Sequence, residues 1–314
     1  MSLYEDQVSD IAIYPIKSCH AATVNGHAVS SLEVGPTGFQ VYDVRDREFV
    51  LVDAEPETDG RLRFISQRGW GENGRLAYRN DSQMAAFETN ITEDSLTVSS
   101  KIGELVIGAR YSETDRTNKV RVHGSTLTSA FDQGPRAADY FTELFERPVR
   151  LARANRSEPR FLKGKYWRPN ASNQVAGADS MPFLLINRAS VAACEQEFGK
   201  SVPTEQYRPN ITLHGFYPFI EDSADLLLIG EMAAYVVKAC ARCPIPNIDQ
   251  NTGERTTAGM KILGNRRGYI NPDDGQDVFM GQNLNHVYVP GTVVSVGDRV
   301  DFVTMHDTPN FTLL

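Results

Sequence analysis

Short strand-like segments, separated by turns rich in Gly and Asp, dominate the first 130 residues of this 314-residue chain. Residues 8–16 are apolar on alternate positions, and residues 48–53 read as a buried strand. Residues 96–98 and 105–107 are spaced as the two arms of a hairpin. Many short strands joined by tight turns are typical of a barrel or a sandwich. The last part of the chain returns to the same β-type pattern, so the fold is expected to be rich in strands.

Two helices are expected to interrupt this pattern. The first begins near Pro135 and ends before Pro148, because proline fits a first helical turn and stops a helix that reaches it. The second runs from Arg188 to Phe198, with Asn187 as its N-cap and Gly199 just beyond its end. Both carry apolar residues at helical spacing, which predicts that they pack against the core.

The tetrapeptide Cys240-Ala241-Arg242-Cys243 brings together two of the four cysteines. It follows a strand-like run at 233–238 and enters a proline-rich loop. Thiolates are soft metal ligands and good nucleophiles, and the intervening arginine favours their ionised form. Three interpretations stay open: half of a zinc site, a redox disulfide, or two buried cysteines without a chemical role. The sequence offers no second Cys pair or His-x3-His to complete a zinc site, and the prolines oppose the helix with which a thioredoxin-like pair begins.

Residues 155–179 are rich in Arg, Lys, Pro, Asn and Gly, which predicts a long loop. Within it, residues 160–168 mix basic and aromatic side chains. Such a segment can bind single-stranded nucleic acid, lie in solvent with a few anchored aromatics, or cover a site as a lid. The net charge of −8 favours the solvated interpretation and opposes general nucleic-acid binding, which needs a positive surface. Any anionic ligand therefore needs a local cluster of cations.

The chain is expected to be cytoplasmic and not bound to a membrane. No apolar run approaches the roughly 18 residues of a membrane helix. Residues 1–20 lack the basic start and apolar stretch of a signal peptide. Four cysteines without a regular framework indicate a reducing compartment.

Six short motifs occur in one order along the chain. They are Tyr14-Pro15-Ile16-Lys17-Ser18-Cys19, Val44-Arg45-Asp46-Arg47-Glu48-Phe49, Ala178-Asp179-Ser180-Met181-Pro182-Phe183, Tyr207-Arg208-Pro209-Asn210-Ile211, Cys240-Ala241-Arg242-Cys243 and Phe279-Met280-Gly281-Gln282-Asn283. With these motifs the chain resembles the MOSC-domain family, and within it the amidoxime-reducing components and the bacterial proteins that protect against N-hydroxylated bases. The resemblance covers nearly the whole chain. It implies a β-rich α+β fold, with an N-terminal β-barrel-like domain at residues 1–130 and a MOSC β-barrel domain with a few helices at residues 131–314.

The family binds a molybdenum cofactor, a pterin that carries a dithiolene and a phosphate, and the resemblance implies the same ligand here. Cys243 is then the metal ligand and a catalytic residue, with Cys240 as its structural neighbour. Asp179 is implied to be a second catalytic residue that relays protons or steers water, although it could equally turn the chain before the strand at 182–186. The implied cofactor-binding residues are Lys17, Ser18, Arg47, Ser180, Arg208, Asn210, Arg242 and Asn283.

These residue types suit such a ligand, because Lys and Arg hold phosphates and amides or hydroxyls match the polar edge of a pterin. Taken alone, each has an ordinary alternative. Arg47 could lie on a solvated strand face, Arg208-Pro209-Asn210 could be a plain turn, and Lys17 could be an exposed lysine at a strand end.

The resemblance implies a molybdenum-dependent reduction of small N-hydroxylated compounds to amines or amidines. The chain has no cysteine after Cys243 for an iron–sulfur cluster and no Gly-x-Gly-x-x-Gly fingerprint within a β-α-β unit. We therefore expect a separate electron-donor protein of the flavin or cytochrome reductase type. The alternatives are a module that holds sulfur or the pterin cofactor through Cys243 without turnover, and a scaffold without cofactor. The resemblance to MOSC domains also implies pyridoxal phosphate binding as a general property of such domains.

Overall fold

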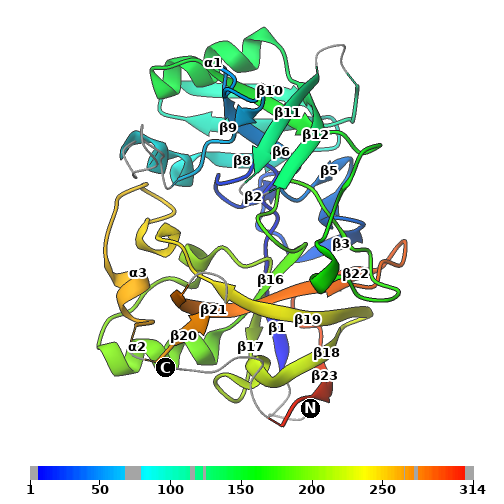
Figure 1. The fold of residues 1–314 in the computed structure, drawn as a ribbon, viewed down its shortest axis with the longest axis vertical. Helices are drawn as coiled ribbons and strands as arrows, with labels where there is room; N and C mark the ends of the chain where they lie inside the picture. Colours follow the sequence, from blue (N-terminus) through cyan, green and yellow to red (C-terminus); the bar gives the residue numbers. More distant parts are fainter. Residues whose placement is uncertain are drawn as a thin grey trace.

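The computed structural model describes residues 6–67, 79–113, 117–122, 125–264, 266–271 and 275–307. Strands predominate, and their sheets are arranged in two halves along the long axis of the molecule (Figure 1). The predicted β-rich α+β fold, with an N-terminal barrel-like part, a second β-rich part and few helices, is confirmed.

Three small sheets form most of the upper half in Figure 1. They are β22 (Val293–Ser295), β3 (Ser31–Gly35), β4 (Gly38–Val41) and β5 (Val44–Arg45); then β10 (Gly103–Gly108), β9 (Ser95–Ser100), β8 (Glu88–Ile91) and β2 (Ala22–Val24); and finally β6 (Phe49–Asp53), β13 (Val149–Ala154), β12 (Ser125–Asp132), β11 (Thr117–Val122) and β7 (Leu62–Arg63). Short strands with frequent turns, as the sequence predicts, let these sheets bend around a common interior.

One eight-stranded sheet forms the lower half in Figure 1. Its strands, in order, are β1 (Gln7–Ile11), β17 (Ile211–His214), β16 (Phe183–Asn187), β21 (Gly275–His286), β19 (Met232–Ala241), β18 (Ala224–Ile229) and β23 (Val300–Met305), with β20 (Gly268–Asn271) paired to β21 beside this path. The long strands β19 and β21 form the centre of the sheet, and their pairing shifts register between Val236 and Lys238 and again between Ala239 and Ala241.

Segments from both ends of the chain cross between the halves. β1 pairs antiparallel with β17 in the lower sheet, where Gln7 lies opposite His214. β22 pairs with β3 in the upper half, where Val293 lies opposite Glu33. In addition, β12 runs through the position where the sequence places a domain boundary, between residues 130 and 131, and pairs with β13. The hydrogen-bonded structure of the upper half therefore continues to Ala154.

The helices are few and follow the local signals of the sequence. α2 (Arg188–Phe198) has the predicted bounds: the Asn187 side chain accepts a hydrogen bond from the Ala189 backbone N–H at 3.0 Å, and Gly199 ends the helix with φ 72°. α1 (Pro135–Phe145) also begins at the predicted proline. The other helical segments of the described residues are α3 (Ala258–Lys261), η2 (Arg79–Ala86), η3 (Gly164–Tyr166), η4 (Thr204–Tyr207), η5 (Ile220–Ser223) and η6 (Ile245–Asn247).

A shared hydrophobic core joins the two halves. One cluster of buried side chains includes Ile13 and Phe49 from the upper half and Phe183 and Leu284 from the lower sheet, all fully buried. The Phe39 and Phe183 rings meet edge to face across this core, with centroids 4.8 Å apart. Because interiors of this kind are close-packed, loops from both halves are held in a fixed relation where they meet.

The prediction of a structureless loop over residues 155–179 is wrong in part. β14 (Arg160–Phe161) pairs with β15 (Gln174–Val175), and η3 lies between them. Buried Leu162 and Val175 anchor this hairpin, whereas the Phe161 and Trp167 side chains are exposed. In the described part of the chain, no helix is both long enough and apolar enough to cross a membrane.

Candidate functional site

A cavity of about 520 Å³ lies where loops of the two halves meet. All ten residues named from the sequence line it: Lys17, Ser18, Arg47, Asp179, Ser180, Arg208, Asn210, Arg242, Cys243 and Asn283. They come from separate parts of the chain, and apart from Asn283 in β21 they lie in connecting segments. The structure thus brings the predicted set together, while the role of each residue stays a prediction.

Three residues that line this cavity have strained backbone conformations. Ser18, Arg47 and Arg208 have φ angles of 70°, 49° and 57°, in the left-handed region that residues with a Cβ seldom occupy. Each such conformation costs on the order of 1–2 kcal/mol and persists only where the surroundings enforce it. Around Arg47, the enforcing contact is close: its carbonyl accepts a hydrogen bond from the Gly177 N–H at 2.8 Å, and a Cβ on Gly177 would come within 2.5 Å of that oxygen.

Asn210 supports Arg47 in the cavity wall. Its buried side-chain oxygen accepts hydrogen bonds from Arg47 Nη1 at 2.9 Å and from the Leu184 N–H at 3.3 Å. Its amide nitrogen donates to the Ala12 carbonyl at 3.2 Å. The amide of Asn210 is therefore committed to protein partners, and the geometry fits a support for the arginine better than a direct contact to a ligand.

Lys17 and Asp179 form an ion pair at the edge of the cavity. The Lys17 side chain is buried, and its ammonium lies 5.0 Å from the centroid of the Phe64 ring. Burial lowers the pKa of Lys17, an effect that the nearby Asp179 carboxylate opposes. The Asp179 side chain is 54% exposed, so the pair links a buried cation to solvent.

The cysteine segment forms another wall. β19 extends to Ala241, so Cys240 lies within the strand, whereas Cys243 follows it; both are partly buried. Arg242 turns toward Cys240, with Nη1 3.2 Å from its sulfur, and donates from Nη2 to the Tyr207 carbonyl at 2.8 Å. Beyond Cys243, the single turn of η6 is fixed against α3, where a Cβ on Gly259 would lie 1.9 Å from the Pro246 carbonyl oxygen.

The classical interpretations of the cysteine pair find no support. Neither Cys240 nor Cys243 is in a disulfide. Among the residues that the structure describes, there is no group of three or more His, Cys, Asp or Glu side chains able to hold a metal ion. Both cysteines line the cavity, where a thiolate would suit a soft metal.

Three cations of the cavity, Arg160, Lys163 and Lys238, are not among the site residues named from the sequence. Arg160 folds inward from β14 and donates to the carbonyls of Ala176, at 3.2 Å, and Ala178. Burial lowers its pKa to about 10. Lys238 on β19 lies over the Tyr166 ring at 4.8 Å. The basic character of residues 160–168 was the available signal for Arg160, whereas nothing local marks Lys238.

The charge of the lining is strongly one-sided. Of the described residues, seven cationic side chains line the cavity against one carboxylate, that of Asp179; the cations are Lys17, Arg47, Arg160, Lys163, Arg208, Lys238 and Arg242. Two buried guanidinium atoms, Arg208 Nη2 and Arg242 Nε, have no hydrogen-bond partner in the described structure. Burial, reinforced by Arg47, lowers the pKa of Arg208. These residues fit an anionic ligand that carries a thiolate-binding metal.

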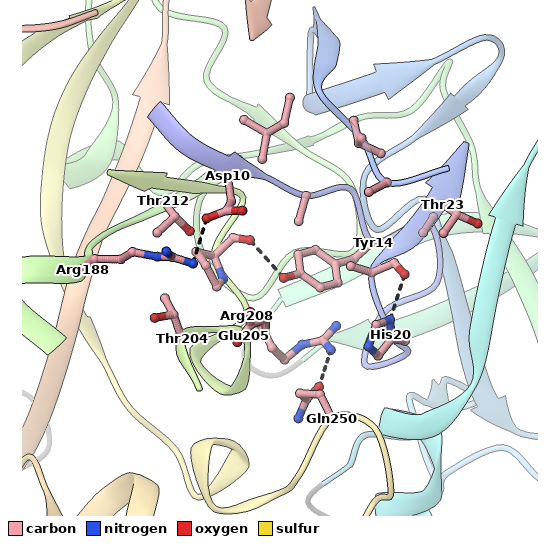
Figure 2. Close-up of a pocket in the computed structure, with 17 residues that line it drawn as sticks. Asp10, Tyr14, His20, Thr23, Arg188, Thr204, Glu205, Arg208, Thr212 and Gln250 are labelled. Atoms are coloured by element: carbon pink, nitrogen blue, oxygen red, sulfur yellow. Dashed lines mark hydrogen bonds and ion pairs between the residues drawn. The ribbon is translucent and has the colours of Figure 1, made fainter. Parts of the chain in front are cut away.

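A second, smaller cavity of about 270 Å³ shares Arg208 with the first (Figure 2). Its other residues include Tyr14, His20 and Gln250, and Arg208 Nη1 donates to the Gln250 side-chain oxygen at 2.9 Å. Gln250 also exchanges hydrogen bonds with Gln67. This network ties Arg208 to segments of both halves of the molecule.

Comparison with known proteins places this geometry in a family. A model of the MOSC N-terminal beta barrel domain matches residues 5–148, and a model of the MOSC domain matches residues 172–301. The human protein named mitochondrial amidoxime-reducing component 1 is 27% identical over 306 residues, which are 93% of this chain and 82% of the human one. The bovine protein named mitochondrial amidoxime reducing component 2 is 26% identical over 257 residues, covering 78% of this chain and 67% of its own. A solution structure of a Bordetella bronchiseptica protein overlaps 35% of this chain and 73% of its own at 15% identity, with a TM-score of 0.25. The chain belongs to the family of proteins in which a MOSC N-terminal beta barrel domain is followed by a MOSC domain.

Proposed function

We propose that this protein is a molybdenum-cofactor oxidoreductase that reduces N-hydroxylated compounds to amines or amidines, with electrons from a separate donor protein. Relatives that are similar over most of the chain are named for amidoxime reduction. The observation that carries the proposal is the convergence of two cysteines, Cys240 and Cys243, and a cluster of cations on a single cavity in a protein of net charge −8.

The cationic residues would hold the anionic parts of the cofactor. Arg47 and Arg208 offer guanidinium groups, which bind phosphate in a fork geometry, and Ser18 and Ser180 offer hydroxyls to the polar edge of the pterin. Cys243 would supply the protein thiolate to the metal. When bound, the cofactor supplies the two-electron chemistry that the side chains themselves lack.

The protein would supply the protons. Reduction of a hydroxylamine, R–NHOH, to R–NH₂ and water consumes two electrons and two protons. The Lys17–Asp179 pair is suited to deliver these protons, because Lys17 Nζ is buried at the cavity, with a pKa lowered by burial, and the Asp179 carboxylate reaches solvent. Asp179 can therefore take up a proton from water while Lys17 holds its carboxylate in place.

The hairpin at the mouth of the cavity is the proposed docking surface for the donor. Phe161 and Lys163 line the cavity, and the Phe161 and Trp167 side chains are 61% and 53% exposed. Lys163 and Lys165 are exposed on the same segment. Exposed aromatics flanked by cations match an acidic redox partner of the flavin or cytochrome reductase type, since complementary charge speeds association.

The test begins with protein made in a host that synthesises the molybdenum cofactor. We expect bound molybdenum and pterin, and turnover of a simple amidoxime with a chemical reductant. Cys243→Ala should lose the metal and the activity, whereas the matched variant Cys240→Ala should keep the metal. Equal loss of molybdenum from both variants would contradict the role of Cys243. Bound cofactor without any turnover would instead favour the carrier module, and protein without cofactor would favour the scaffold.

A further inference from the structure

Tyr14 is the aromatic residue on which two arginines of the main cavity meet. The Arg47 guanidinium carbon lies 4.8 Å from the centroid of the Tyr14 ring, and that of Arg208 lies 4.4 Å from it. Tyr14 itself is not among the residues lining the main cavity; it lines the smaller one, where Figure 2 shows its ring between β1 and the Arg208 turn. The ring of Tyr14 therefore contacts the two guanidinium groups from the side of the smaller cavity.

The backbone and hydroxyl of Tyr14 fix the segments that carry both arginines. Its N–H donates to Asp46 Oδ1 at 2.7 Å, and its carbonyl accepts from the Arg47 N–H at 2.7 Å. Its hydroxyl donates to the Pro209 carbonyl, next to Arg208, at 3.0 Å. One buried residue, Tyr14, thus connects the turn of Arg47 through its backbone with the turn of Arg208 through its hydroxyl. Both Arg47 and Arg208 have the strained φ angles described above.

The Tyr14 ring lies against two arginine side chains that repel each other. Arg47 and Arg208 carry like charges; Arg208 is buried and Arg47 partly buried, and they lie close enough for Arg47 Nη2 to contact the Arg208 carbonyl at 3.4 Å. Repulsion between them is strong in a medium of low dielectric constant. The Asp46 carboxylate already pairs with Arg47 and offsets part of this repulsion. The electron-rich face of an aromatic ring attracts both guanidinium groups without a further negative charge, whereas a second carboxylate in the same place would compete with an anionic ligand.

We propose that Tyr14 is a positioning residue that holds the Arg47 and Arg208 guanidinium groups together for the anionic part of the cofactor, without adding a negative charge to that of Asp46. This inference rests on the proposed function, because it assumes that the main cavity takes an anion. It assigns to the first motif of the chain a role beyond that of Lys17 and Ser18: the motif also provides the support for the arginines.

The chain contains a matched control. Tyr111 lies beneath two other guanidinium groups, those of Arg153 at 5.3 Å and Arg156 at 4.5 Å. Neither arginine lines the main cavity, and both are paired with Glu48. Loss of the Tyr111 ring should therefore perturb stability through the same kind of contact without affecting an anion in the main cavity.

The experiment measures binding of inorganic phosphate, by titration calorimetry, to folded protein prepared without cofactor. Tyr14→Met keeps a flexible apolar side chain but removes the ring, and we expect about tenfold weaker binding, a loss of about 1.4 kcal/mol. Tyr14→Phe keeps the ring and should bind within about threefold of the wild type, which separates the ring from the hydroxyl. Tyr111→Met should bind phosphate as the wild type does. Pterin content of protein made in a cofactor-producing host should follow the same order.

A second variant covers the case in which Tyr14→Met does not fold. Pentafluorophenylalanine at position 14 keeps the shape of phenylalanine but reverses the charge distribution of the ring face, so it should weaken phosphate binding relative to Tyr14→Phe. Equal binding by Tyr14→Phe and the fluorinated protein, or by the wild type and a folded Tyr14→Met, overturns the inference and leaves the proposed function intact. A wild-type protein that takes up neither phosphate nor pterin overturns both.

Discussion

Replacing Arg47 with methionine should destabilise the cofactor-free protein, and more strongly as the pH rises. The Asp46 carboxylate beside Arg47 is 1% exposed, and its partners include Arg47 and the Tyr14 N–H at 2.7 Å. Burial already raises the pKa of Asp46, and Arg47 opposes that rise. Without the guanidinium, the carboxylate is left uncompensated, which in buried pairs costs on the order of 3–5 kcal/mol.

The variant can protonate Asp46 instead of burying its charge, so the free energy of this protonation is the upper limit of the penalty. Starting from an ordinary aspartate pKa of 3.8, neutralising the group costs about 4 kcal/mol at pH 7 and about 1.6 kcal/mol at pH 5. A folded-state pKa that is raised removes stability as the pH increases above the unfolded value. Relative to the wild type, Arg47→Met should therefore lose up to about 2–3 kcal/mol more at pH 7 than at pH 5.

Urea unfolding of cofactor-free protein at the two pH values measures this difference. The double variant Asp46→Asn/Arg47→Met should lose the extra pH dependence and recover part of the stability at pH 7, because no buried charge remains. Arg61→Met, which breaks the solvent-exposed Arg61–Asp59 pair, should show no comparable change. A penalty for Arg47→Met that is equal at pH 5 and pH 7, or a double variant no more stable than the single one, would refute the assignment of the cost to the Asp46 charge.

Three further predictions test other parts of the molecule. Lys165→Gln, at an exposed lysine of the hairpin that does not line the cavity, should slow reduction by an acidic donor protein at low salt and flatten the salt dependence of its rate, leaving the rate with a small chemical reductant unchanged; an unaltered salt dependence would remove this hairpin as the docking surface. Burial lowers the pKa of His286 to about 4, so the wild type should lose up to about 3 kcal/mol between pH 6.5 and pH 4 from this residue, and His286→Gln should flatten urea-unfolding stability over that range. Gly259→Ala should push the Pro246 carbonyl away and displace the segment after Cys243. The molybdenum content of the protein should then fall, although Gly259 does not line the cavity. Full molybdenum content would show that the segment adjusts without moving Cys243.

The elements that the sequence predicted best are those specified by local contacts. α2 has the predicted bounds because its cap at Asn187 and its stop at Gly199 each act within one turn of the helix. The crossing of β1 and β22 into opposite halves was not predicted, since a strand pattern shows that a segment pairs but not with which partner. The hairpin of β14 and β15 escaped notice for a related reason, because a two-residue strand leaves almost no periodic signal.

The candidate site shows the same division between local and long-range information. Their spacing alone is equally compatible with Arg47 on a solvated strand face and with Arg208 in a plain turn. Only the resemblance to the MOSC-domain family predicts both as cofactor-binding residues. The cation at Lys238 was missed because its neighbours in the sequence describe an ordinary strand, and only the shift of register against β21 accompanies its position at the cavity. The hydrogen bonds of the Asn210 amide to Arg47, the Leu184 N–H and the Ala12 carbonyl also depend on long-range contacts that its sequence neighbours do not show.

The acidic surface and the cationic cavity are compatible because they act over different distances. At physiological salt the Debye length is about 8 Å, so the net charge of −8 is largely screened for a ligand that approaches through solvent. Inside the cavity, screening by ions is weak, and the seven lining cations determine the potential. At low salt the negative potential of the protein extends further into solvent and repels an acidic donor. Lys163 and Lys165 attract this donor only at close range. The balance of these two effects implies that the fastest donor has its acidic groups concentrated around its redox centre rather than spread over its surface.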